Sequence, residues 1–242
     1  MIPYDYLFVL VVALAAGILS GIVGFGSSIM LMPVLVLQFG PKEAVPVMAV
    51  AALMANLSRI LAWWREVDWR ACAAYAVTGA PFAALGARTL LVLPTRAVEI
   101  ALGLFFIFMI PARRWMSSHQ MTPRLPHLAL AGAIIGYLTG MVVSTGPINV
   151  PVFLAYGLVK GAFLATEAAG SLAVYFAKAT TFRLYDALPS ESIVKGLIIG
   201  SSIMAGSFVA KRFVLKLQPD YFRLMMDGIM FASGASMIWA AV

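Results

Sequence analysis

Apolar positions fill most of the chain, and polar positions are confined to short stretches between long apolar runs. The first run extends from Leu7 to Gly40, about 34 residues, and only a glycine-rich patch from Gly21 to Ser28 interrupts it. A straight helix of that length would reach roughly 50 Å, whereas the hydrocarbon core of a bilayer is about 30 Å thick. The run therefore predicts a membrane helix that is broken at the patch.

A second long apolar run contains a similar interruption. The interruption starts at Gly132 and consists of glycines, hydroxyl residues and Pro147, mainly between Gly136 and Asn149. Backbone groups exposed at a break are costly in lipid, so breaks persist only where protein or a water-filled cavity satisfies them, typically at a transport site. The two patches are therefore the first candidates for a functional site.

Windows of about 20 apolar residues predict membrane spans along the whole chain. We therefore expect an all-α integral membrane protein with about eight transmembrane helices in two repeats of four, the first helix of each repeat being broken. The predicted spans are 7–39, 44–64, 71–91, 95–112, 127–157, 162–182, 192–213 and 220–241.

A polar connector divides the chain into two nearly equal halves that resemble each other. Pro33 matches Pro151 and Arg59 matches Lys178, at offsets of 118 and 119 residues. An even number of spans per repeat predicts that the repeats share one orientation, related by a pseudo-twofold axis along the membrane normal; a re-entrant segment over 28–39 would weaken this inference. The expected units are a first repeat over 1–112, the connector over 113–126 and a second repeat over 127–242.

Composition supports the membrane assignment and excludes a sizeable soluble domain. Hydrophobic residues make up 62% of the chain, charged residues make up 11%, and the mean hydropathy is +0.96, far outside soluble globular usage. The net charge of +7 comes from basic residues scattered near predicted helix ends. Because they form no stripe, we expect membrane lipids rather than nucleic acid as partners.

Each break is a candidate anion site. A helix that restarts inside the membrane presents free N–H groups and the positive end of its dipole, glycines allow close backbone approach, and hydroxyl and amide side chains add donors. For the outlying glycines Gly17, Gly21, Gly132 and Gly136 we favour close helix packing instead. The candidate anion-binding residues at the breaks are Gly24, Gly26, Ser27, Ser28, Ser144, Thr145, Gly146 and Asn149.

Four ionisable residues extend the candidate site. Arg59 and Lys178 occupy matching positions about one turn before the ends of their spans, which is equally compatible with a shared central cavity and with snorkelling to the interface. The acids Glu167 and Asp227 lie about two turns inside their spans, where each could carry a coupling proton or form a structural ion pair.

Enzyme chemistry has little support in the sequence. His119 and His127 have no carboxylate or cysteine at metal-ligand spacing, and the single Cys72 cannot form a disulfide within the chain. Nucleophile elbows, phosphate loops and zinc-protease motifs are absent as well. We therefore expect no catalytic residue, no metal and no cofactor.

Several of these motifs resemble the TauE/SafE family of sulfite exporters over essentially the whole chain. The resemblance depends on the run from Gly17 to Gly26 that leads into Met32-Pro33 and ends at Gly40, on its weaker second copy from Gly140 to Gly157, and on the run from Gly79 to Arg88. It implies an eight-span permease that moves small sulfur-containing anions, such as sulfite or sulfonates, across the bacterial cytoplasmic membrane.

The function expected is thus a secondary transporter of a small anion, bound near the midplane between the two broken helices. The absence of a nucleotide-binding motif leaves an ion gradient, the membrane potential or the substrate gradient as the energy source. An anion channel and, less favoured, an intramembrane enzyme are the alternatives. A homo-oligomer is compatible with the sequence.

Overall fold

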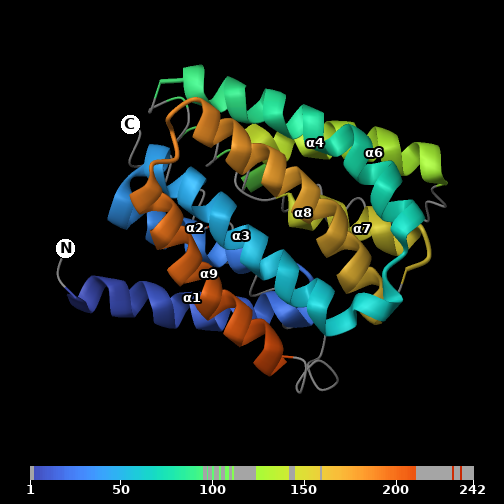
Figure 1. The fold of residues 1–242 in the computed structure, drawn as a ribbon, viewed down its shortest axis with the longest axis horizontal. Helices are drawn as coiled ribbons and strands as arrows, with labels where there is room; N and C mark the ends of the chain where they lie inside the picture. Colours follow the sequence, from blue (N-terminus) through green and yellow to red (C-terminus); the bar gives the residue numbers. More distant parts are fainter. Residues whose placement is uncertain are drawn as a thin grey trace.

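The computed structural model describes residues 3–94, 124–141, 145–158 and 160–210, with isolated positions between 97 and 111 and at 231 and 235. Within these residues every regular element is a helix (Figure 1). The elements are α1 (Pro3–Val23), α2 (Ser27–Phe39), α3 (Pro41–Trp63), the short 3-10 helix η1 (Trp64–Glu66), α4 (Trp69–Val92), α6 (Leu125–Met141), α7 (Gly146–Ala155), α8 (Lys160–Leu184) and α9 (Ser190–Ala210).

Both predicted breaks are confirmed. The first separates α1, which ends at Val23, from α2, which begins at Ser27, and the second separates α6 from α7, which begins at Gly146. The predicted spans 44–64, 71–91, 162–182 and 192–213 correspond to α3, α4, α8 and α9. Apart from the isolated positions named above, the spans 95–112 and 220–241 and most of the connector lie outside the described residues.

At the first break the chain folds back on itself. The ring of Tyr6, near the start of α1, lies 6.4 Å from the ring of Phe39, at the end of α2. The start of α1 and the end of α2 are therefore neighbours, and the break is the tip of a helical hairpin. The shorter arm, α2, packs between α1 and α3.

The second break forms a matching hairpin. Gly132 on α6 packs against the backbone of Tyr75 on α4, and the Tyr75 ring lies 5.2 Å from that of Phe153 on α7. Gly140, at the far end of α6, lies against Ala87, three turns further along α4. Because Gly132 on α6 and Phe153 on α7 both contact Tyr75, the start of α6 and the end of α7 are neighbours, as in the first hairpin.

Corresponding helices of the two halves run in opposite directions. Gly17 on α1 packs against Ile203 on α9, and Gly21 packs against Ala210, so α1 and α9 are parallel. On α3 and α8, Arg59 pairs with Glu167, whereas the later Trp63 contacts the earlier Gly161, so these two helices are antiparallel. Glycine contacts likewise make α4, α6 and α8 parallel to one another, as are α3 and α9.

The expectation of one shared orientation is therefore wrong. Its physical reason is the fold-back at each break, because a hairpin returns the chain to the side from which it came. A long apolar run that folds into such a hairpin adds no net crossing, so each half has one crossing fewer than its apolar runs suggest. The structure matches the re-entrant alternative for 28–39, and the inverted arrangement is one that transporters use.

Small residues allow the helices to approach closely. A Cβ on Gly136 would lie 2.7 Å from Cα of Gly79, and one on Gly21 would lie 2.9 Å from Cα of Ser207. Gly17 and Gly132 are likewise enclosed by backbone atoms of the facing helix. The packing interpretation of these outlying glycines is confirmed.

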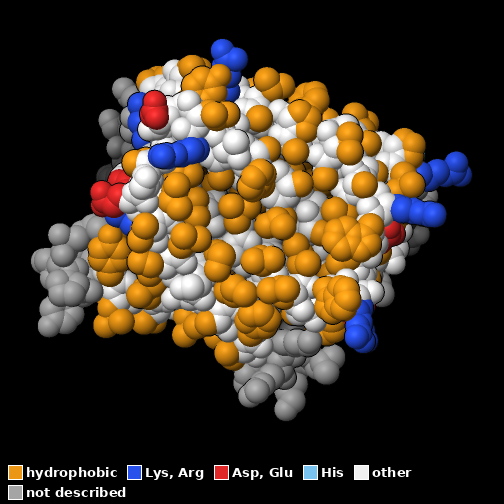
Figure 2. Space-filling model, viewed as in Figure 1, with side chains coloured by type: hydrophobic (Ala, Val, Ile, Leu, Met, Phe, Trp, Pro, Cys, Tyr) orange, Lys and Arg blue, Asp and Glu red, His pale blue; other side chains and the backbone are white. Residues whose placement is uncertain are grey.

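The surface is that of a membrane protein. Among the described residues, three helices are long and apolar enough to cross a bilayer, namely Lys42–Glu66, Trp69–Val92 and Ser190–Ala210. Figure 2 shows hydrophobic side chains covering the middle of one face, while charged side chains gather toward its opposite edges. Leu130, Ile134 and Phe176 are also exposed, which suits contact with lipid.

Candidate functional site

The tips of the two hairpins meet inside the helix bundle. Phe25, in the first break, packs against Gly146 at the start of α7. A small cavity lies between the tips and is completed by α3 and α8. The cavity volume is about 30 Å³, which is room for about one or two waters.

The first break contributes four of the predicted residues to the cavity wall, namely Gly24, Gly26, Ser27 and Ser28. Gly24 and Gly26 have φ angles of 88° and 115°, which lie in the left-handed region that side chains with a Cβ avoid. These two glycines let the chain reverse within three residues, and α2 then begins with its first-turn N–H groups unpaired within the helix. The buried hydroxyls of Ser27 and Ser28 lie at this helix start.

The second break contributes Thr145, Gly146 and Asn149. The Thr145 hydroxyl is hydrogen-bonded to that of Thr139 near the end of α6, so the tip of this hairpin is closed by side chains. Asn149, in the first turn of α7, is buried and reaches across to α8. Ser144 lies outside the described residues.

Arg59 enters the cavity from α3 and is almost fully buried, at 6% exposure. Its terminal nitrogens donate to the carbonyl oxygen of Gly24, to Oδ1 of Asn56 and to Oε2 of Glu167, the last at 2.7 Å. Among the described residues, Arg59 Nε is the one buried side-chain nitrogen or oxygen that has no hydrogen-bond partner. A buried donor without an acceptor is unfavourable, so this atom marks a place where a ligand oxygen would be stabilised.

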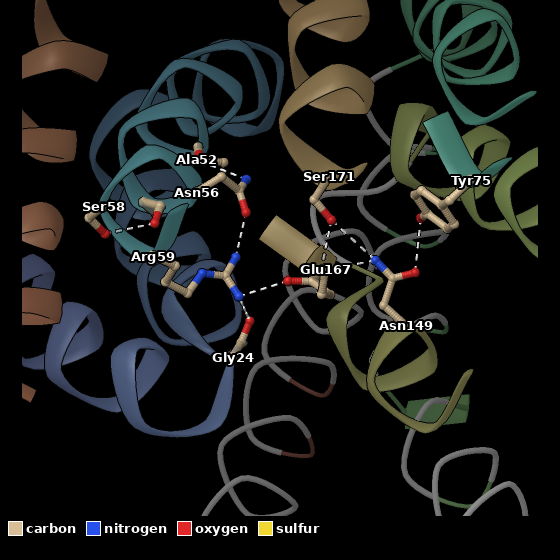
Figure 3. Close-up of polar contacts among 10 residues, drawn as sticks. Gly24, Ala52, Asn56, Ser58, Arg59, Tyr75, Asn149, Glu167 and Ser171 are labelled. Carbon is tan, nitrogen blue, oxygen red and sulfur yellow. Dashed lines mark hydrogen bonds and ion pairs between the residues drawn. The ribbon is translucent and has the colours of Figure 1, made fainter. Parts of the chain in front are cut away.

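Glu167 faces Arg59 from α8 and lies on the same cavity (Figure 3). Its Oε1 accepts from Ser171 Oγ at 2.7 Å and from Asn149 Nδ2 at 3.1 Å. The Tyr75 hydroxyl donates to Asn149 Oδ1 at 2.9 Å, which fixes the orientation of the amide. The carboxylate is therefore paired with one cation and held by two further donors.

Lys178 is buried on α8, at 1% exposure, but it is not part of the cavity wall. Its Nζ donates to the carbonyl oxygen of Thr139 at 2.6 Å and lies 5.7 Å from the ring centre of Phe182. The snorkelling interpretation is therefore wrong for both cations. Each reaches inward to a carbonyl near the tip of a hairpin, Arg59 at Gly24 and Lys178 at Thr139.

The structure adds residues that sequence reasoning missed. Asn56 lies one turn before Arg59 on α3, and Ser171 lies one turn after Glu167 on α8, so helical spacing from the predicted residues could have found both. Tyr75 and Thr139 arrive from α4 and α6 and have no such signal. Asp227, the other predicted coupling acid, lies outside the described residues.

Together these groups make a polar cavity of balanced charge inside an apolar bundle. Donors from α2, α3 and α7 surround a small space. Among the described residues of its wall, the one cation, Arg59, is neutralised by the one acid, Glu167. The described residues hold no group of three or more histidine, cysteine, aspartate or glutamate side chains placed to bind a metal ion.

A comparison with protein families gives one result. The family model described as sulfite exporter TauE/SafE matches residues 9–237, which covers the tips of both hairpins and every described site residue. No significant match is found among curated proteins or solved structures. A match over nearly the whole chain, together with apolar helices suited to a bilayer, shows that this membrane protein belongs to the TauE/SafE sulfite exporter family.

Proposed function

We propose that the protein is a secondary transporter that carries a small anion across the bacterial cytoplasmic membrane, through the cavity between the hairpin tips. The anion is sulfur-containing, such as sulfite or an organosulfonate. The chain crosses the membrane several times. Family membership supports transport as the activity, and the cavity supports an anion as the cargo.

The observation that carries this proposal is the unpartnered Nε of Arg59. An arginine that served only to neutralise Glu167 would gain nothing from a buried N–H left without an acceptor. An anion oxygen placed there would satisfy the donor and would form a charge-assisted hydrogen bond. The guanidinium is also shielded from water, which strengthens its attraction for an anion.

The hairpin tips supply the remaining donors. The N-terminus of α2, with Ser27 and Ser28, and the N-terminus of α7, with Thr145 and Asn149, both open onto the cavity. Helix N-termini favour negative charge. A sulfite or sulfonate group presents three oxygens in different directions, which suits donors that arrive from several helices.

The opposite directions of the two halves suit alternating access. In an inverted arrangement, one half can rock against the other and expose the same site first to one side of the membrane and then to the other. Ion gradients, the membrane potential or the substrate gradient would drive the cycle.

Ligand-induced thermal stabilisation of purified protein tests the binding site. The experiment compares sulfite, methanesulfonate, sulfate and acetate. A ligand that binds only the folded state stabilises it by about 2.7 kcal/mol when its concentration is one hundred times its dissociation constant, so the melting temperature reports binding. We expect sulfite or methanesulfonate to raise the melting temperature. Arg59→Lys, which keeps the charge but loses the Nε donor, should weaken this binding roughly five- to 150-fold.

Arg65→Lys is the matched control, since Arg65 is exposed and stacks on Trp64 at 5.6 Å. It should bind like the parent protein. Stabilisation that survives unchanged in Arg59→Lys would remove Arg59 from the anion site. Counterflow in proteoliposomes separates the transporter from a channel, because only a carrier exchanges labelled for unlabelled anion with saturation.

A further inference from the structure

The cavity already contains an anion of its own, the Glu167 carboxylate. Its Oε2 lies 2.7 Å from Arg59 Nη1, and both side chains are more than nine-tenths buried. The pair is neutral as it stands. A second negative charge brought into this space would meet the Glu167 carboxylate at close range, and burial would strengthen their repulsion.

The small size of the cavity also indicates that an anion cannot bind while Arg59 and Glu167 remain paired. The cavity admits about one or two waters, so an anion with three oxygens requires side chains to separate. The terminal nitrogens of Arg59 are engaged by Gly24, Asn56 and Glu167. Of these three partners only the carboxylate can lose its attraction for the guanidinium, by taking up a proton.

The surroundings of Glu167 are suited to holding it in either charge state. Ser171 and Asn149 donate to Oε1, which remains an acceptor when Oε2 is protonated. The protonated Oε2 would become a donor that faces the cavity and the bound anion. Among the described residues, the charged or titratable groups around Glu167 are Arg59 on α3, Tyr75 on α4 and Tyr175 on α8. Glu66 on η1, Asp68 before α4 and Lys178 on α8 lie elsewhere on these elements, and α6 and α7 contribute the uncharged Thr139 and Asn149 to the cavity wall.

We propose that the transported anion and the Glu167 carboxylate compete for Arg59, so that Glu167 takes up one proton for each anion that binds. This inference depends on the proposed anion site. The proton comes from solvent and adds to Oε2, the ion pair between Glu167 and Arg59 separates, and the anion replaces the carboxylate on the guanidinium. Anion movement is thereby coupled to proton movement in the same direction.

Proton uptake measured directly on the full-length protein tests the proposal. Methanesulfonate is added to purified protein in weakly buffered detergent solution, and the change in pH is recorded alongside calorimetric binding. This probe stays ionised throughout, so any proton taken up is taken up by the protein. Above neutral pH we expect about one proton per bound anion and an affinity that falls up to about tenfold per pH unit.

Glu167→Gln removes the competing charge while keeping the shape of the side chain. It should bind methanesulfonate with no proton uptake, with an affinity that does not depend on pH, and about tenfold or more tightly than the parent protein at high pH. Glu167→Asp, which keeps a titrating carboxyl group, should retain proton uptake. Glu66→Gln, at an exposed acid on η1, is the matched control and should behave like the parent protein.

The outcomes separate this proposal from the proposed function. Binding without proton uptake by the parent protein overturns the competition and leaves the anion site in place. Uptake that persists in Glu167→Gln but disappears in Lys178→Gln assigns the proton to Lys178 and also overturns it. If no anion binds the parent protein at any pH, the proposed function itself fails. If Glu167→Gln unfolds, the parent protein and Glu167→Asp still decide the question.

Discussion

The two buried cations each hold a carbonyl oxygen near the tip of a hairpin. Arg59 donates to Gly24 O, just beyond the end of α1, and Lys178 donates to Thr139 O, in the last turn of α6. The final carbonyls of a helix have no partner within the helix, and a cation there also complements the helix dipole. The difference is that Arg59 additionally faces the cavity, whereas Lys178 does not.

This difference predicts a structural effect at Lys178. Lys178→Gln should lower the free energy of unfolding by about 1–3 kcal/mol, because the Thr139 carbonyl loses a charged donor in a buried place. Its melting temperature in detergent, measured without ligand, checks this. Lys178→Arg, which keeps a charged donor, should recover part of the loss. An unchanged melting temperature with weakened anion binding would place Lys178 in the anion site instead.

The same residues show how far sequence reasoning reached. Glycine and hydroxyl patterns inside overlong apolar runs located both breaks, because few other arrangements tolerate such residues there. Arg59 and Glu167 were each singled out, but nothing in the sequence showed that they pair, since the contact joins positions 108 residues apart. Tyr75 was missed because it reaches the site only through the packing of α4 against α8 and the contacts of its own side chain with Asn149 and Phe153 on α7.

At the scale of helices, the pairing of α4 with α6 depends on close backbone approach. Gly79 and Gly86 on α4 face Gly136 and Gly140 on α6, and added Cβ atoms would meet main-chain atoms of the opposite helix. Backbone cannot move aside as a flexible side chain can. This contact anchors the outgoing arm of the second hairpin, which ends beside the cavity.

We therefore predict that Gly136→Ala separates the two helices. It should destabilise the protein by about 1–3 kcal/mol, the usual effect of overpacking in a tight interior. Ile134→Ala, on the exposed face of the same helix, is the control and should change stability far less. Thermal unfolding of both variants in the same detergent makes the comparison. Equal melting temperatures would show that the α4–α6 contact tolerates a methyl group.

The direction of the helices could not be read from the chain. Hydrophobicity reports that a segment is apolar and long, but it is the same for a segment that crosses a bilayer and one that folds back halfway. The fold-back depends on left-handed backbone at Gly24 and Gly26 and on packing of α2 against α1 and α3. Counting spans thus predicted parallel repeats where the structure has antiparallel ones.

At the scale of the whole molecule, an open pocket lies at the end where α2 meets α3 and α8 meets α9. This vestibule has a volume of about 570 Å³, and its wall includes Lys42, Glu43, Leu90, Phe182, Glu191 and Lys195. Lys195 forms ion pairs with Glu43 and Glu191, both at 2.9 Å. Along α8, Phe182 on the vestibule wall and Tyr175 on the cavity wall are two turns apart, with Lys178 between them.

Access to the two spaces should differ. In a Cys72→Ser background, we expect Ala187→Cys on the vestibule wall to react with a membrane-impermeant maleimide from one side of the membrane only. Ala55→Cys on the cavity wall should be protected, since Ala55 is buried. Labelling of right-side-out and inside-out vesicles measures both. Equal reaction at the two positions, or from both sides at Ala187→Cys, would contradict this arrangement.

The Arg59–Glu167 ion pair has a further consequence for a protein that works across a charged membrane. One elementary charge moved through the membrane potential is worth about 2.3 kcal/mol per 100 mV. With no cargo bound, the guanidinium and the carboxylate cancel within the cavity, so these two residues present no net charge to the field. The return of the empty site in a transport cycle would therefore require no electrical work on this pair.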